Sequence, residues 1–238
     1  MPYVHAAMPC WVPIELRQVP SIESEPPTFI GSADQLRHDL LGRALSIGAE
    51  FVIRGPGWMP QADASSGPSE PTSIGRVLKH QVDLVRQHGW RAIGQKIEGR
   101  LRPLSPAVVP QSKILGPIFG AEYARVTREA IVTIGVNRVP TPRRSPRRPL
   151  VYSRLRDIEA PMLGACYLTE WTPGLEHLYE LGTEIECYRT AEELTSKLTE
   201  IRQDFSRRSA LRSRAQGRAL AHHTVGRSIE RIRAHFSL

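Results

Sequence analysis

The stretch TFIGSADQLRHDLLGRALSIGAEFVIRGPGW, residues 28–58, contains the pattern that decides the fold. Its first four residues predict a short buried strand, and Ser32 followed by Gln35 is a capping pattern that begins a helix. The helix has apolar residues at helical spacing and ends near Gly48, and residues 51–54 predict a second strand. Strand, helix and strand in this order indicate a βαβ crossover.

The same alternation continues along the chain. Helices are predicted at 73–101, 121–129, 154–163, 173–179 and 190–201 and, in one or two pieces, at 205–237, and strands at 130–136, 166–169 and 184–188. The spacing of Val225, Ile229, Ile232 and Phe236 predicts a buried side for the last helix. Strands separated by helices predict an α/β domain, with a Rossmann-like, mostly parallel sheet and helices on both faces.

The N-terminal residues differ from the rest. Residues 1–27 contain six prolines and no sustained periodicity, so we expect an extended lead-in or the remnant of a linker. The domain itself is then residues 28–238, including its C-terminal helices. Within it, residues 139–149 hold four prolines and four arginines and are expected to form an irregular basic loop.

The charge is distributed unevenly. The chain has a formal net charge of +8, but residues 1–70 hold four Lys/Arg and eight Asp/Glu, which gives −4 and leaves +12 for residues 71–238. This excess predicts an anionic partner for the second part of the chain, such as nucleic acid, an acidic membrane surface or a nucleoside diphosphate.

Several classes of protein are disfavoured. The three cysteines are far apart and form no CxxC, which argues against a disulfide framework or a zinc site. His222 and His223 have no acidic or cysteine partner at ligand spacing, so we expect structural roles for them. The sequence has neither an apolar run long enough for a transmembrane segment nor a signal-peptide pattern, and we therefore expect a cytoplasmic location.

Two segments carry a resemblance to a known family. Residues 156–194, RDIEAPMLGACYLTEWTPGLEHLYELGTEIECYRTAEEL, resemble the donor site of group 1 glycosyltransferases: a glutamate, a helix of small residues, a glycine, a strand, another glycine and another glutamate. Residues 29–58 are similar to the opening of the C-terminal domain of the CgeB-like (spore maturation protein type) branch. The resemblance implies the C-terminal half of a GT-B glycosyltransferase, which binds a nucleoside diphosphate sugar.

The resemblance also implies an acceptor domain. A Rossmann-type acceptor domain needs on the order of 100 residues, and residues 1–27 are too short for one. We therefore expect that domain to be missing from this sequence or supplied by another chain, and the acceptor stays unknown. No metal cofactor is implied, because Arg138, Arg154 and Arg156 could neutralise the diphosphate instead.

Individual site residues follow from the same match. Glu159 corresponds to the donor-site glutamate, which implies hydrogen bonds from the ribose hydroxyls. From spacing alone, the alternative for Glu159 is an i,i+3 ion pair with Arg156 on an exposed helix face. Glu176 corresponds to the other glutamate of the pattern, although it could equally be an acid stabilised by the dipole of its helix.

Backbone groups supply the remaining candidates. A helix start at Thr172, Gly174 and Leu175 could bind the diphosphate through its N–H groups, or it could be an ordinary helix start. The strand ends at 31–32 and 55–57 are where open α/β sheets bind ligands, and their glycines could admit a phosphate or simply form tight turns. The candidate residues there are Gly31, Ser32, Gly55 and Gly57.

One position departs from the family pattern. Retaining relatives often have a sugar-contacting glutamate eight residues before the position of Glu159, and this chain has Val151 there. No catalytic residue is therefore assigned. A catalytically incomplete glycosyltransferase-like domain that acts as a binding or partner module is one alternative. A basic nucleic-acid-binding protein is another, which we consider unlikely because the basic segments lack interleaved aromatic residues.

Overall fold

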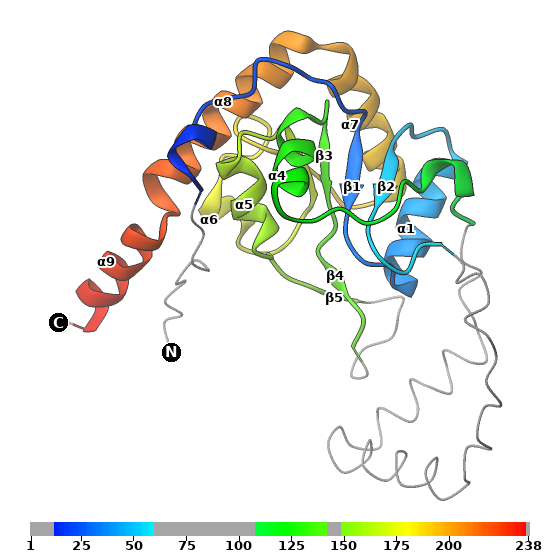
Figure 1. Cartoon of the computed structure of the whole chain (residues 1–238). Helices are drawn as coiled ribbons and strands as arrows, with labels where there is room; N and C mark the ends of the chain where they lie inside the picture. Colours follow the sequence, from blue (N-terminus) through cyan, green and yellow to red (C-terminus); the bar gives the residue numbers. More distant parts are fainter. Residues whose placement is uncertain (1–11, 60–107, 142–148, 237–238) are drawn as a thin grey trace, which may run out of the picture.

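The computed structural model describes residues 12–59, 108–141 and 149–236 (Figure 1). Its centre is a five-stranded sheet in the order β2-β1-β3-β6-β7, and every neighbouring pair of strands is parallel. The strands are β1 (Thr28–Ile30), β2 (Val52–Arg54), β3 (Thr133–Gly135), β6 (Tyr167–Glu170) and β7 (Glu186–Tyr188). The α/β, Rossmann-like prediction is confirmed.

The predicted βαβ unit is present, with one correction. Helix α1 (Gln35–Ser46) connects β1 to β2, and Phe29 pairs with Ile53 in the parallel register. The N-cap is Asp34, whose carboxylate accepts hydrogen bonds from two N–H groups of the first turn at 3.0 and 2.9 Å. The prediction of Ser32 as the N-cap is wrong, because the chain makes two further residues of turn before the helix begins.

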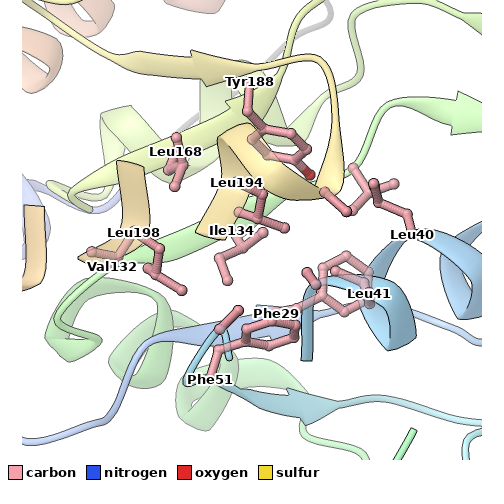
Figure 2. Packing of buried hydrophobic residues seen from close by; sticks show 14 of the residues in the cluster. Phe29, Leu40, Leu41, Phe51, Val132, Ile134, Leu168, Tyr188, Leu194 and Leu198 are labelled. Atoms are coloured by element: carbon pink, nitrogen blue, oxygen red, sulfur yellow. The ribbon is translucent and has the colours of Figure 1, made fainter. Parts of the chain in front are cut away.

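Helices cover both faces of the sheet. Helices α1 and α7 (Ala191–Gln203) pack on one face, and α4 (Gly120–Glu129), α5 (Arg156–Met162) and α8 (Phe205–His222) pack on the other. Alternate strand residues point to opposite faces, so Leu168 belongs to the first core cluster and Tyr167 to the second. Figure 2 shows side chains of α1 and α7 converging on Phe29 and Ile134 of the sheet.

The predicted lead-in packs against the domain over the part that the structure describes. After the short 3-10 helix η1 (Ile14–Leu16), the chain crosses α8 (Figure 1). Gln216 of α8 donates to the Leu16 carbonyl at 3.1 Å, and Glu23 accepts from Arg208 and Arg212 of the same helix at 2.7 and 3.2 Å. These contacts connect the N-terminal segment to the C-terminal half of the chain.

The last helix differs from its prediction. Helix α9 (Val225–Phe236) extends away from the sheet in Figure 1, and Ile229 and Phe236 are 50% and 63% exposed. The predicted buried side is therefore wrong: the apolar stripe exists, but Ser228 is the residue of this helix that is buried. No helix in the described ranges is long and apolar enough to cross a membrane.

The remaining elements are short. Strands β4 (Arg138–Val139) and β5 (Leu150–Val151) form an antiparallel pair, so the segment predicted to be irregular from residue 139 begins within a strand. Helix α6 (Leu175–Leu178) and the 3-10 helix η2 (Gln111–Lys113) complete the described chain. The helix predicted at 73–101 and the four arginines of the basic loop lie outside the described residues.

Candidate functional site

The sheet order creates a natural ligand site. Strand β1 lies between β2 and β3. The chain therefore runs from β1 to β2 on one side of it, and the next strand of the sheet, β3, is added on the other side. Open α/β sheets bind ligands at such a switch point, beyond the carboxyl ends of the strands. A pocket of about 280 Å³ is found there, and the residues that line it are Phe29, Ile30, Gly31, Ser32, Arg37, Val136, Asn137, Arg154, Leu155, Arg156, Glu159 and Tyr167.

Three arginines give this pocket its charge. Arg37 of α1 donates to the Ser32 carbonyl at 2.7 Å and approaches the Asp34 carboxylate at 3.3 Å. Burial lowers the pKa of the Arg37 guanidinium; the nearby Asp34 opposes this shift, and the positive charges of Arg154 and Arg156 add to it. The guanidinium groups therefore repel one another, and an anion bound among them would relieve that repulsion.

Glu159 is the acid among the lining residues. Its Oε2 accepts a hydrogen bond of 2.5 Å from the Tyr123 hydroxyl of α4. Arg156, one turn earlier on α5, donates to the Ile30 carbonyl, and its guanidinium lies 5.3 Å from the centre of the Tyr123 ring. No ion pair joins Arg156 to Glu159 in the part of the chain that the structure describes, so that alternative is not supported.

A buried carboxylate fixes the start of α5. Asp157 is fully buried and accepts hydrogen bonds from Tyr167 and Thr169 of β6, at 2.8 and 2.9 Å, and from the amide of Asn137 at 3.0 Å. It also accepts from the Arg154 backbone N–H at 3.0 Å. Burial, followed by the charge of Asp157, raises the pKa of Tyr167 well above its usual value. The network holds the start of α5, and therefore Arg154 and Arg156, against two strand ends.

The other predicted residues are placed differently. Arg138 pairs with Glu170 at 2.6 Å, and Glu170 also accepts from the Asn137 and Arg138 backbone N–H groups, so this arginine supports the strand ends. The candidates that follow β6 do not line the pocket; they are Thr172, Gly174, Leu175 and Glu176. Among them, Leu175 is buried in the core, and the hydroxyl of Thr172 is buried without a hydrogen-bond partner in the described structure.

The candidate glycines divide into two kinds. Gly31 lines the pocket, together with Ser32, whereas Gly55 and Gly57 do not. Gly55, at φ +146°, faces the Gly31 backbone directly. Trp58 is buried and donates from Nε1 to the Gly31 carbonyl at 2.6 Å. The end of β2 therefore supports the end of β1, which is the part that reaches the pocket.

Sequence reasoning missed Arg37, Tyr123 and Asn137. Arg37 carried a weak signal: a basic residue in the first turn of a helix opposes the helix dipole, which makes an arginine at this position unexpected. Asn137 carried the signal of its position, directly after the strand predicted at 130–136, whereas Tyr123 carried none, because its partner Glu159 is 36 residues away. In the described ranges, no three His, Cys, Asp or Glu side chains gather in a way that could hold a metal ion.

Fold and site together define a Rossmann-like domain with a cationic pocket at its switch point. A family model described as glycosyl transferase-like matches residues 37–234. Because this match covers most of the chain, the protein belongs to the glycosyl transferase-like family. A sequence comparison with curated proteins gives no match.

Solved structures share the fold. Anabaena Alr3699/HepE in complex with UDP matches with a TM-score of 0.52 and 14% identity, over 90% of this chain and 49% of that one. The same protein in complex with UDP-glucose matches with a TM-score of 0.52 and 15% identity, over the same shares of the two chains. The present chain thus spans about half the length of these structures and corresponds to one Rossmann-like half of a GT-B glycosyltransferase.

Proposed function

We propose that this domain binds a nucleoside diphosphate sugar in the switch-point pocket and supplies the donor half of a glycosyltransferase. The observation that carries the proposal is the meeting of Glu159 with three arginines at the carboxyl ends of β1 and β3. A nucleoside diphosphate sugar has the complementary parts: two anionic phosphates and a ribose with hydrogen-bond donors. The complexes of Alr3699/HepE with UDP and with UDP-glucose give the ligand class a precedent in a protein of the same fold.

Each part of the donor has a proposed partner. Arg37, Arg154 and Arg156 bind the diphosphate, and Gly31 lets the backbone of β1 approach it closely. Glu159 accepts hydrogen bonds from the ribose hydroxyls. The helix start at Thr172, Gly174 and Leu175, followed by Glu176, is a second proposed contact for the diphosphate, through its backbone N–H groups. In this proposal the arginines do the work that a metal ion does in other transferases.

The transfer itself needs a second surface. The bond between the anomeric carbon and the diphosphate oxygen breaks, the diphosphate leaves with the bonding electrons, and an acceptor hydroxyl forms the new bond and loses its proton. The arginines stabilise the charge that develops on the leaving diphosphate. We propose that a separate acceptor domain or chain completes the cleft and that the protein is of the CgeB-like type.

Titration calorimetry tests donor binding. UDP, GDP and ADP, each free and as a glucose conjugate, are titrated into the full chain, and at least one should bind in about the micromolar to millimolar range typical of enzyme substrates. Glu159→Ala should weaken the best ligand, because it removes the ribose contact. The matched control is Glu192→Ala, whose exposed carboxylate pairs with Arg43 away from the pocket. Absence of binding for the whole panel would refute the proposal.

A further inference from the structure

An expected ion pair is missing from the pocket. At this spacing some arginines pair with an acid: Arg37 approaches Asp34 at 3.3 Å and Arg227 approaches Glu230 at 2.7 Å. Others do not: among the described contacts, Asp157 and Asp204 accept from the backbone N–H groups of Arg154 and Arg207 and form no ion pair with their side chains. Arg156 and Glu159 have the same spacing on α5, yet they form no such pair among the described contacts. Because this spacing favours an ion pair only weakly, the other contacts of the two side chains decide where each charge lies.

Tyr123 contacts both of them. Its hydroxyl donates to Glu159 Oε2 at 2.5 Å, while the guanidinium of Arg156 lies over the face of its ring, 5.3 Å from the centre. A tyrosine can do both because its hydroxyl is a hydrogen-bond donor and its ring face attracts cations. The guanidinium is also held by the Ile30 carbonyl, which draws it toward β1 and away from the carboxylate.

The position of Tyr123 in the fold matters as well. It is half-buried on α4, which is a different element from the helix that carries Arg156 and Glu159. Tyr123 lines a neighbouring cavity of about 590 Å³. Glu159 lines both that cavity and the switch-point pocket, so its carboxylate stands in the wall between them. The hydroxyl of Tyr123 therefore determines how that carboxylate is oriented relative to the pocket.

We infer that Tyr123 is a positioning residue that makes the pocket selective for a ribose over a deoxyribose. Its hydroxyl occupies Oε2 of Glu159 and leaves Oε1 to accept from the sugar. Without the hydroxyl, the carboxylate is able to turn toward Arg156, which would neutralise one phosphate-binding charge and withdraw the ribose acceptor. This inference rests on the proposed nucleotide binding. It adds Tyr123 to the proposed site and gives the site a preference for ribonucleotides.

The test compares ribo and deoxy ligands. UDP and 2′-deoxy-UDP, or the corresponding guanosine pair if guanosine nucleotides bind better, are titrated into the wild-type chain and into Tyr123→Phe. The wild type should prefer the ribonucleotide by about tenfold, since one hydrogen bond to a charged group is lost with the 2′ hydroxyl. Tyr123→Phe keeps the ring over Arg156 but should reduce this preference to about twofold, because it weakens the ribonucleotide more than the deoxynucleotide.

A second variant separates positioning from a general structural effect. In a Glu159→Ala background, Tyr123→Phe should leave the ribo-to-deoxy ratio unchanged, because the carboxylate on which it acts is gone. Equal loss of affinity for both ligands, or an unchanged ratio in Tyr123→Phe, would overturn the inference while nucleotide binding stands. If the folded wild-type chain binds none of these nucleotides, the proposed function fails, and the selectivity fails with it.

Discussion

A Cβ atom placed on Gly55 would lie 2.1 Å from the carbonyl oxygen of Gly31, so the ends of β2 and β1 are in direct backbone contact. Gly31 lines the switch-point pocket, and its carbonyl also accepts from Trp58 at 2.6 Å. The shape of the pocket therefore depends on a glycine that does not itself reach the pocket.

Substitution of Gly55 should accordingly be costly. Gly55→Ala adds a steric clash with backbone to an unfavourable positive φ, and we expect it to lower the free energy of unfolding by about 3 kcal/mol or more. Gly48→Ala is the matched control: its φ is also positive, at +101°, but the added Cβ meets nothing within 4 Å, so only about 1 kcal/mol of backbone strain is expected. Urea denaturation measures the free energy of unfolding of both variants. Equal losses for Gly55→Ala and Gly48→Ala would contradict the close backbone contact of Gly55 with Gly31.

The N-terminal segment should contribute to stability through Glu23. Its carboxylate accepts from Arg208 and Arg212, and Arg212 is only 2% exposed. Glu23→Ala leaves these guanidinium groups without their acid, and we expect a loss of about 3 kcal/mol in urea denaturation together with faster proteolysis of residues 12–24. Glu230→Ala is the control: it removes the ion pair with Arg227, in which both side chains are exposed, and should change the midpoint of urea denaturation negligibly. A similarly small effect of Glu23→Ala would show that the segment is not held by this triad.

His223 should make stability depend on pH. Burial lowers the pKa of His223; the hydrogen bond to the Leu178 carbonyl opposes this, and the charges of Arg231, Arg218 and His222 add to it. The unfolded chain takes up the proton near the ordinary pKa of about 6.5, whereas the folded chain takes it up only at lower pH. The contribution of the neutral His223 side chain to the free energy of unfolding is therefore complete above about pH 6.5. It is lost as the pH falls through the lowered pKa of the folded state.

Melting temperatures between pH 7.5 and pH 5 test this expectation. His223→Gln keeps an amide donor for the Leu178 carbonyl but does not titrate, so its melting temperature should fall less on acidification than that of the wild type. His222→Gln, at the exposed neighbour, should behave like the wild type. Parallel curves for His223→Gln and the wild type would exclude His223 as the origin of acid sensitivity.

The strands of the sheet could be predicted from the sequence, but the residues of the pocket could be predicted only in part. The buried apolar run around Ile134 and the strand before Gly31 follow from local pattern, because a parallel strand buried on both faces is apolar throughout. The start of α1 was assigned two residues too early, since Ser32 and Asp34 are both good N-caps and only the path of the turn selects between them. For Ile229, periodicity predicted an apolar stripe but could not say whether anything covers it.

The pocket residues show the same limit more sharply. Strand ends can be located from sequence, which is why Gly31 was found, and the resemblance to the glycosyltransferase donor site pointed to Arg156 and Glu159. The partners of a side chain cannot be located in this way: Tyr123 is 36 residues from Glu159. Local spacing favoured an ion pair between Arg156 and Glu159, whereas in the structure each of them contacts Tyr123, which lies on another helix.

The binding of UDP, or of whichever nucleotide in the panel binds best, to Arg154→Ala tests the central claim most directly. Arg154 lines the pocket, and its guanidinium carbon lies 5.8 Å from the centre of the Tyr152 ring. Because it enters no ion pair among the described residues, its removal should leave the unfolding midpoint unchanged. We predict a Kd about tenfold higher than that of the wild type, the value expected for loss of one charged hydrogen bond to phosphate, with no change in Arg43→Ala, whose exposed side chain pairs with Glu192. Wild-type affinity in a folded Arg154→Ala variant would contradict donor binding at this pocket.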